Sequence, residues 1–110
     1  FGSDVAIEND LIVIGASLYD VPSNNDSGAA YIFTRSGTNW SEDQILTATE
    51  FYSSNNRFGT SVAIGNGEIF VAARKAKIDS PGASVGSIFT YKNNGGNWEQ
   101  QQQLTIPPLN

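Results

Sequence analysis

Residues that could bind an ion gather in one short acidic segment of the chain, residues 20–27. Within it, Asp20, Asn24 and Asp26 provide two carboxylates and an amide oxygen. Calcium prefers oxygen ligands of these kinds, so the three residues form the candidate metal site, and calcium is the one candidate cofactor. The alternative is structural, because Asp, Asn, Ser and Pro are also the residues from which turns are built.

Residues that could bind an anion or a sugar lie in other polar segments. Half of the six basic residues fall within residues 74–77. There they could bind an acidic glycan or a carboxylate of a partner, although a partly exposed charge pair is the simpler interpretation. Aromatic rings in the polar segments could stack on sugars. The candidate ligand-binding residues are Tyr19, Phe51, Tyr52, Arg74, Lys75 and Lys77.

Other aromatic residues are predicted to belong to the core. Tyr31 and Phe33 are two positions apart, so their side chains share one face of a strand, which we expect to lie between two sheets. Trp40 and Trp98 recur at the same position of a repeated unit, which favours packing over two separate binding sites.

Composition excludes most catalytic chemistry. The 110-residue chain contains no His and no Cys, so it cannot build a Ser-His-Asp triad, a cysteine nucleophile or a His/Cys zinc site. Carboxylate pairs such as Asp20 with Asp26, or Glu42 with Asp43, could in principle hydrolyse glycosides. Neighbours in a strand point to opposite faces, which removes the second pair. The sequence predicts a protein that is not an enzyme.

Charge and hydropathy exclude two classes of partner. Six basic residues against eleven acidic ones give a formal net charge of -5, which provides no surface for a phosphate backbone. No apolar run approaches the ~20 residues that span a bilayer. Neither nucleic acid binding nor membrane insertion is therefore expected. Asn25 and Asn39 stand in N-glycosylation triplets, but chance alone gives roughly two such triplets in this composition.

An internal repeat organises the chain. Residues 1–9 recur as residues 58–66, because both segments begin with Phe-Gly and continue with Val-Ala-Ile at the same spacing. Such self-similarity predicts that one structural unit is present twice.

The similarity continues to the end of each unit with changes in spacing. Ile32-Phe33-Thr34 matches Ile88-Phe89-Thr90 at an offset of 56, and Asn39-Trp40 matches Asn97-Trp98 at an offset of 58. The changes of offset predict small differences in length between residues 17 and 27 and again around Gly37.

Each unit contains four short β-like segments, and no stretch keeps a helical period. Asn9-Asp10 and Asn66-Gly67 suit two-residue hairpin turns. The apolar run of residues 11–14 favours a central strand that is covered on both faces. Polar residues within 40–46 and 98–104 favour an edge strand. The sequence therefore predicts an all-β protein.

The order of these motifs resembles the FG-GAP repeat, a family that includes the integrin α-subunit propeller and many secreted or surface proteins of microbes. The chain runs Phe-Gly-x-x-Val-Ala-Ile, a hairpin, Ile-Val-Ile-Gly-Ala, a variable loop, Gly-Ala-Ala-Tyr-Ile-Phe-Thr and Trp-x5-Leu. Gly15-Ala16-Ser17 stands where the family has Gly-Ala-Pro, and the second copy has Ala72-Ala73-Arg74. The resemblance implies two four-stranded antiparallel β-propeller blades, residues 1–57 and residues 58–110.

One departure from the family concerns calcium. Integrin-type repeats hold a D-x-D/N-x-D-G loop between their first two strands. Here that connection is Glu8-Asn9-Asp10 in one copy and Gly65-Asn66-Gly67 in the other, which is too short to surround an ion with six to eight oxygens. The family's usual calcium cage is therefore not expected.

Two blades do not close a propeller, which typically has four to eight. We therefore expect further blades as partners, either from a longer chain or from other copies, and an isolated chain that is not a well-behaved monomer. Equivalent loops of adjacent blades lie on one propeller face, so the acidic and basic segments should lie side by side.

The resemblance implies a non-catalytic extracellular binding or adhesion module, located outside the cell or at its surface. Such a module would contact protein or glycan through loops on one propeller face. The alternative is a structural subunit that assembles with copies of itself into a ring or filament and has no small-molecule ligand.

Overall fold

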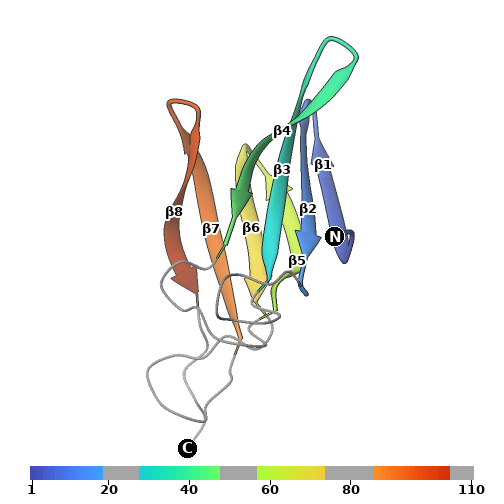
Figure 1. Cartoon of the computed structure of the whole chain (residues 1–110). Helices are drawn as coiled ribbons and strands as arrows, with labels where there is room; N and C mark the ends of the chain where they lie inside the picture. The colour runs from blue at the N-terminus through green and yellow to red at the C-terminus, as the bar shows by residue number, and fades with distance from the viewer. Residues whose placement is uncertain (19–27, 48–56, 74–85, 105–110) are drawn as a thin grey trace, which may run out of the picture.

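The protein consists of two four-stranded antiparallel β-sheets that follow one another along the chain (Figure 1). The computed structural model describes residues 1–18, 28–47, 57–73 and 86–104. Sheet 1 contains β1 (Asp4–Glu8), β2 (Leu11–Ala16), β3 (Ala29–Ser36) and β4 (Asn39–Leu46). Sheet 2 contains β5 (Phe58–Gly65), β6 (Glu68–Ala73), β7 (Ser87–Asn94) and β8 (Asn97–Leu104). The predicted all-β fold of two four-stranded sheets is confirmed, and no helix occurs in the described ranges.

Tight turns join the strands pairwise at one end of the molecule, the upper end in Figure 1. Asn9 and Asn66 have φ angles of 54° and 51°, in the left-handed region that Asn adopts more readily than most residues. Gly67 follows at 76°. The predicted β1–β2 and β5–β6 hairpins are therefore confirmed.

The strand register corrects the alignment of the two units. Val13 pairs with Ile32 in sheet 1, whereas Phe70, which is equivalent to Val13, pairs with Thr90 in sheet 2. Ile32 is therefore equivalent to Thr90, at an offset of 58, and the predicted match with Ile88 is wrong. The same offset continues through β4 and β8, so the described strands need no change in length at the β3–β4 turn. A shift of two residues leaves every side chain on its original face, which is why alternation alone could not detect it.

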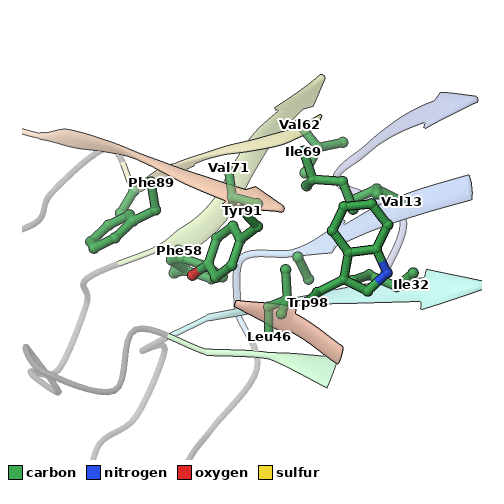
Figure 2. Close-up of a cluster of buried hydrophobic side chains, with 12 residues drawn as sticks. Val13, Ile32, Leu46, Phe58, Val62, Ile69, Val71, Phe89, Tyr91 and Trp98 are labelled. Carbon is green, nitrogen blue, oxygen red and sulfur yellow. The ribbon is translucent and has the colours of Figure 1, made fainter. Parts of the chain in front are cut away.

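The sheets pack face to face, with β5 lying against β1, β2 and β3. Figure 2 shows Leu46 and Ile32 of sheet 1 in one cluster with Tyr91 and Trp98 of sheet 2. The buried core consists of Val13, Ala30, Ile32, Leu46, Phe58, Val62, Ile69, Val71, Ala73, Phe89, Tyr91 and Trp98. Each sheet therefore has one joined face, which lines this core, and one open face on its other side.

Glycine allows the two backbones to touch within the joint. A Cβ on Gly15 would lie 2.0 Å from the carbonyl oxygen of Gly59, and a Cβ on Gly59 would lie 2.2 Å from that of Ala29. The Ser3 hydroxyl donates a hydrogen bond of 3.1 Å to the same Gly59 carbonyl. Side chains larger than hydrogen at Gly15 or Gly59 would force the sheets apart.

The structure confirms some local predictions and corrects others. β4 and β8 are edge strands, as predicted. The packing role predicted for the two tryptophans holds for Trp98, which is buried in the core, and is wrong for Trp40, which is exposed. Tyr31 and Phe33 share a face, but it is the open face of sheet 1, where Phe1 contacts both rings. Alternate residues of β3, among them Ile32, face sheet 2 instead. Which of the two faces is joined depends on where β5 docks, and local alternation does not specify that.

Candidate functional site

The long connections leave and re-enter the sheets at the end opposite to the hairpin turns. Ala16 at the end of β2 pairs with Ala29 at the start of β3, and Ala73 at the end of β6 pairs with Ser87 at the start of β7. A parallel bridge from Gly28 to Phe58 brings the starts of β3 and β5 together. The described ends of three long connections therefore converge on one end of the molecule, which we call the loop-bearing end.

All of the predicted ligand and metal residues belong to these connections. Tyr19, Asp20, Asn24, Asp26, Phe51, Tyr52, Arg74, Lys75 and Lys77 lie outside the described residues. Their roles, and the side-by-side placement of the acidic and basic segments, stay predictions. Asn25 also lies outside the described ranges, whereas Asn39 is exposed at the start of β4.

Polar groups connect the two sheets around the apolar core. The Val62 amide donates a hydrogen bond of 3.0 Å to an Asp4 carboxylate oxygen. The Gln44 side chain brackets the Trp98 backbone: its Nε2 donates to the Trp98 carbonyl at 3.0 Å, and its Oε1 accepts from the Trp98 amide at 2.9 Å. A single amide side chain therefore satisfies both main-chain groups of a residue across the joint.

A cavity of about 230 Å³ lies at the outer side of the joint, between β4 and the β7–β8 hairpin. It combines amide groups from both sheets with an aromatic wall, and it reaches Thr47, the last described residue before residues 48–56. Its lining consists of Gln44, Ile45, Leu46, Thr47, Tyr91, Trp98 and Gln100. A volume of this size accommodates one side chain or one small polar ring rather than an extended ligand.

Two buried donors beside this cavity have no hydrogen-bond partner among the described residues: the Tyr91 hydroxyl and Nε1 of Trp98. Burial raises the pKa of the Tyr91 hydroxyl far above its ordinary value of about 10. The hydroxyl therefore stays protonated and neutral under ordinary conditions. Figure 2 shows the two polar atoms on opposite sides of the cluster, so they do not converge on a single ligand position.

The turn that holds calcium in integrin-type repeats is not suited to the ion here. Asp10 lies in the two-residue β1–β2 turn, and its carboxylate forms an ion pair with Arg35, with 2.7 Å between Oδ1 and Nη2. Glu8 accepts a hydrogen bond of 3.1 Å from the Gly67 amide of the other sheet. The available carboxylates are thus engaged in other contacts. Among the described residues, no group of three or more acidic, His or Cys side chains is arranged to hold a metal.

The described part of the chain also contains no helix that is long and apolar enough to cross a membrane.

Sequence reasoning missed the residues that join the sheets. Gln44 lies on the same face of its sheet as the apolar Ile32 and Leu46. A polar residue whose neighbours on the same face are apolar is a signal for a buried hydrogen bond. Its partner is a main-chain segment 54 residues away, which the sequence does not identify.

Comparison with known proteins agrees with this architecture. Residues 1–33 match the family model of the FG-GAP repeat. A search of curated proteins found no match. The matched residues contain β1, β2 and β3 as far as Phe33, and sheet 2 repeats their topology. Residues 1–33 are thus similar to an FG-GAP repeat, and each four-stranded antiparallel sheet has the topology expected of one β-propeller blade.

Proposed function

We propose that this chain is a non-catalytic, extracellular binding module that contacts a glycan or a protein through its loop-bearing end. The observation that carries the proposal is the convergence of three long connections on one end of two docked sheets. Binding residues are commonly placed on loops that a rigid scaffold positions. FG-GAP repeats are generally non-catalytic and typical of extracellular or surface proteins, which supports both the lack of enzymatic activity and the location.

The composition of the loop segments favours an acidic glycan as the partner to test. Arg74, Lys75 and Lys77 would supply positive charge, and Phe51 with Tyr52 would supply aromatic surface. The adjoining cavity offers amide groups and an aromatic wall of the kind that binds sugar hydroxyls. The rest of the chain is acidic, so a local basic segment would be the main attraction for an anion.

A glycan array tests this proposal with labelled chain and sialylated, sulfated and neutral glycans. We expect signals on acidic glycans that fall at least ~10-fold in a Lys75→Ala/Lys77→Ala double variant, or in a Phe51→Ala/Tyr52→Ala variant. Lys92→Ala is the matched control, because Lys92 is an exposed lysine of β7 that pairs with Glu68 at 3.7 Å. A blank array, or an equal loss in the Lys92 control, would reject glycan binding at the loop-bearing end.

A second candidate function is a structural subunit that assembles with copies of itself. The observation that favours it is the apolar character of both open faces, which include exposed Phe1, Val5, Ile7, Ile88 and Leu104. Contiguous exposed apolar surface usually marks an interaction site.

A further inference from the structure

The open faces of the two sheets differ from each other and face opposite directions. The open face of sheet 1 carries Phe1, Val5, Ile7, Ile12, Ile14 and Phe33. The open face of sheet 2 carries Ala63, Phe70, Ala72, Ile88, Gln102 and Leu104. The partner of each can be inferred because the molecule already contains one joint made from the equivalent positions.

The open face of sheet 1 has the same kinds of large apolar and aromatic side chains as the joined face of sheet 2. Phe1 is 75% exposed and its equivalent Phe58 is fully buried, and Val5 is 61% exposed against 9% for Val62. The aromatic contacts are also repeated, because Phe1 lies edge-on to Tyr31 at 5.2 Å and Phe58 lies edge-on to Phe89 at 5.3 Å. The open face of sheet 1 is therefore suited to contact a surface like the one that sheet 2 contacts within the molecule, which is the joined face of sheet 1.

The open face of sheet 2 repeats the complementary half of the joint. Leu104 is 42% exposed and is equivalent to Leu46, which is 4% exposed in the core. Gln102 is equivalent to Gln44 and Trp40 to Trp98, since both pairs follow the register of β4 and β8. The open face of sheet 2 thus carries the amide side chain of Gln102. The open face of sheet 1 carries Trp40, whose main chain is equivalent to the one that Gln44 binds.

Two residue differences would keep a neighbouring sheet further from the open face of sheet 2 than sheet 2 lies from sheet 1. Ala72 stands at the position of Gly15, where a Cβ would collide with the Gly59 carbonyl, and Ile88 stands at the position of Ala30. Together with Phe70, they leave an apolar hollow of about 120 Å³ on the open face of sheet 2. A neighbouring sheet must therefore rest on side chains there rather than on backbone.

We propose that two copies of this chain dock head to tail, with the open face of sheet 2 of one copy against the open face of sheet 1 of the next. The contact repeats the joint inside the molecule at a wider spacing, so we expect it to be weaker than the internal joint. The resulting dimer keeps one open face at each end, so association continues beyond dimers or closes into a ring.

Sedimentation velocity of the 110-residue chain over a range of concentrations tests this. We expect the sedimentation coefficient to rise with concentration, and to rise further with salt, because each copy carries a net charge of -5. Val5→Asp and Leu104→Asp should each weaken association at least ~10-fold by placing a charge in the contact. Thr38→Asp, in the exposed β3–β4 turn, is the control and should associate like the parent. Circular dichroism checks that each variant folds.

Mixing distinguishes head-to-tail docking from other arrangements. Val5→Asp leaves the open face of sheet 2 intact and Leu104→Asp leaves that of sheet 1 intact, so an equimolar mixture should form a heterodimer while each variant alone stays monomeric. Ala72→Gly, which restores the glycine of the internal joint, should tighten association of the parent ~10-fold. A parent that is monomeric at all concentrations, or a Val5→Asp variant that dimerises alone, would overturn the proposal. Neither outcome depends on glycan binding at the loop-bearing end.

Discussion

Sheets 1 and 2 share several residues at equivalent positions, yet those residues experience different surroundings. The Phe of the Phe-Gly motif is exposed in sheet 1 and forms the centre of the core in sheet 2. The Gln that brackets a backbone in sheet 1 has its equivalent, Gln102, on an exposed edge. The contribution of a repeated residue to stability is therefore set by the neighbouring sheet, and matched substitutions in the two sheets measure that contribution.

Truncating the motif phenylalanine should give the largest contrast. Phe58→Ala removes a fully buried ring and should lower the free energy of unfolding by about 3–5 kcal/mol. Phe1→Ala removes a mostly exposed ring and should change it by less than about 1 kcal/mol. Urea unfolding of dilute protein measures both. Equal losses for the two variants would contradict the assignment of joined and open faces.

Adding one methyl group at the backbone contact should have the next largest effect. Gly15→Ala places a Cβ 2.0 Å from the Gly59 carbonyl oxygen and should cost about 1–3 kcal/mol, because β5 must move away. Gly65→Ala is the control, since its Cβ meets nothing within 4 Å and stability should change by about 0.5 kcal/mol or less. Thermal unfolding followed by circular dichroism would show the contrast; an unaffected Gly15 variant would mean that the sheets do not approach as described.

Removing the side-chain amide of Gln44 should lower the free energy of unfolding by a smaller amount. Gln44→Ala leaves the Trp98 amide and carbonyl without their partner, which should destabilise by about 1–2 kcal/mol. Gln102→Ala should change stability of the dilute protein by about 0.5 kcal/mol or less, because its side chain is exposed. Hydrogen exchange of the Trp98 amide gives a second readout, and it should accelerate only in the Gln44 variant.

The smallest expected effect concerns the tyrosine that replaces a phenylalanine between the sheets. Sheet 1 has Phe33 where sheet 2 has Tyr91, whose buried hydroxyl lacks a hydrogen-bond partner among the described residues. Tyr91→Phe should be neutral or raise the free energy of unfolding by about 1 kcal/mol at neutral pH.

The same substitution should change the response to alkaline pH. The raised pKa of Tyr91 means that the folded state keeps a proton that the unfolded state releases above about pH 10. This contribution to stability is complete below pH 10 and is lost as pH rises further. The parent should therefore lose stability more steeply above pH 10 than the Tyr91→Phe variant. Urea unfolding at several pH values measures this loss. If the free energy of unfolding fell equally steeply with pH in both proteins, the hydroxyl would not be buried.

Much of the local structure could be predicted, because its signals are local. The positive φ at Asn9 and Asn66 follows from their place in two-residue turns, and the edge position of β4 follows from its polar residues. The equivalence of Ile32 with Thr90 could not be predicted, since a shift of two residues preserves the alternation of faces. For the candidate site, the ligand residues that the sequence predicts lie outside the described ranges, whereas the cavity beside Gln44 arises only where two sheets meet.

The repeated Phe-Gly motif, the alternating apolar residues and the turn residues are enough to specify two four-stranded sheets, because each depends on neighbours a few positions away. These local signals do not determine which face of each sheet packs against the other sheet. Both faces of β2 are apolar, and only the docking of β5 at Gly15 buries Val13 while leaving Ile12 and Ile14 on the open side. Tertiary packing thus decided which half of each repeat became core and which half remained available to another molecule.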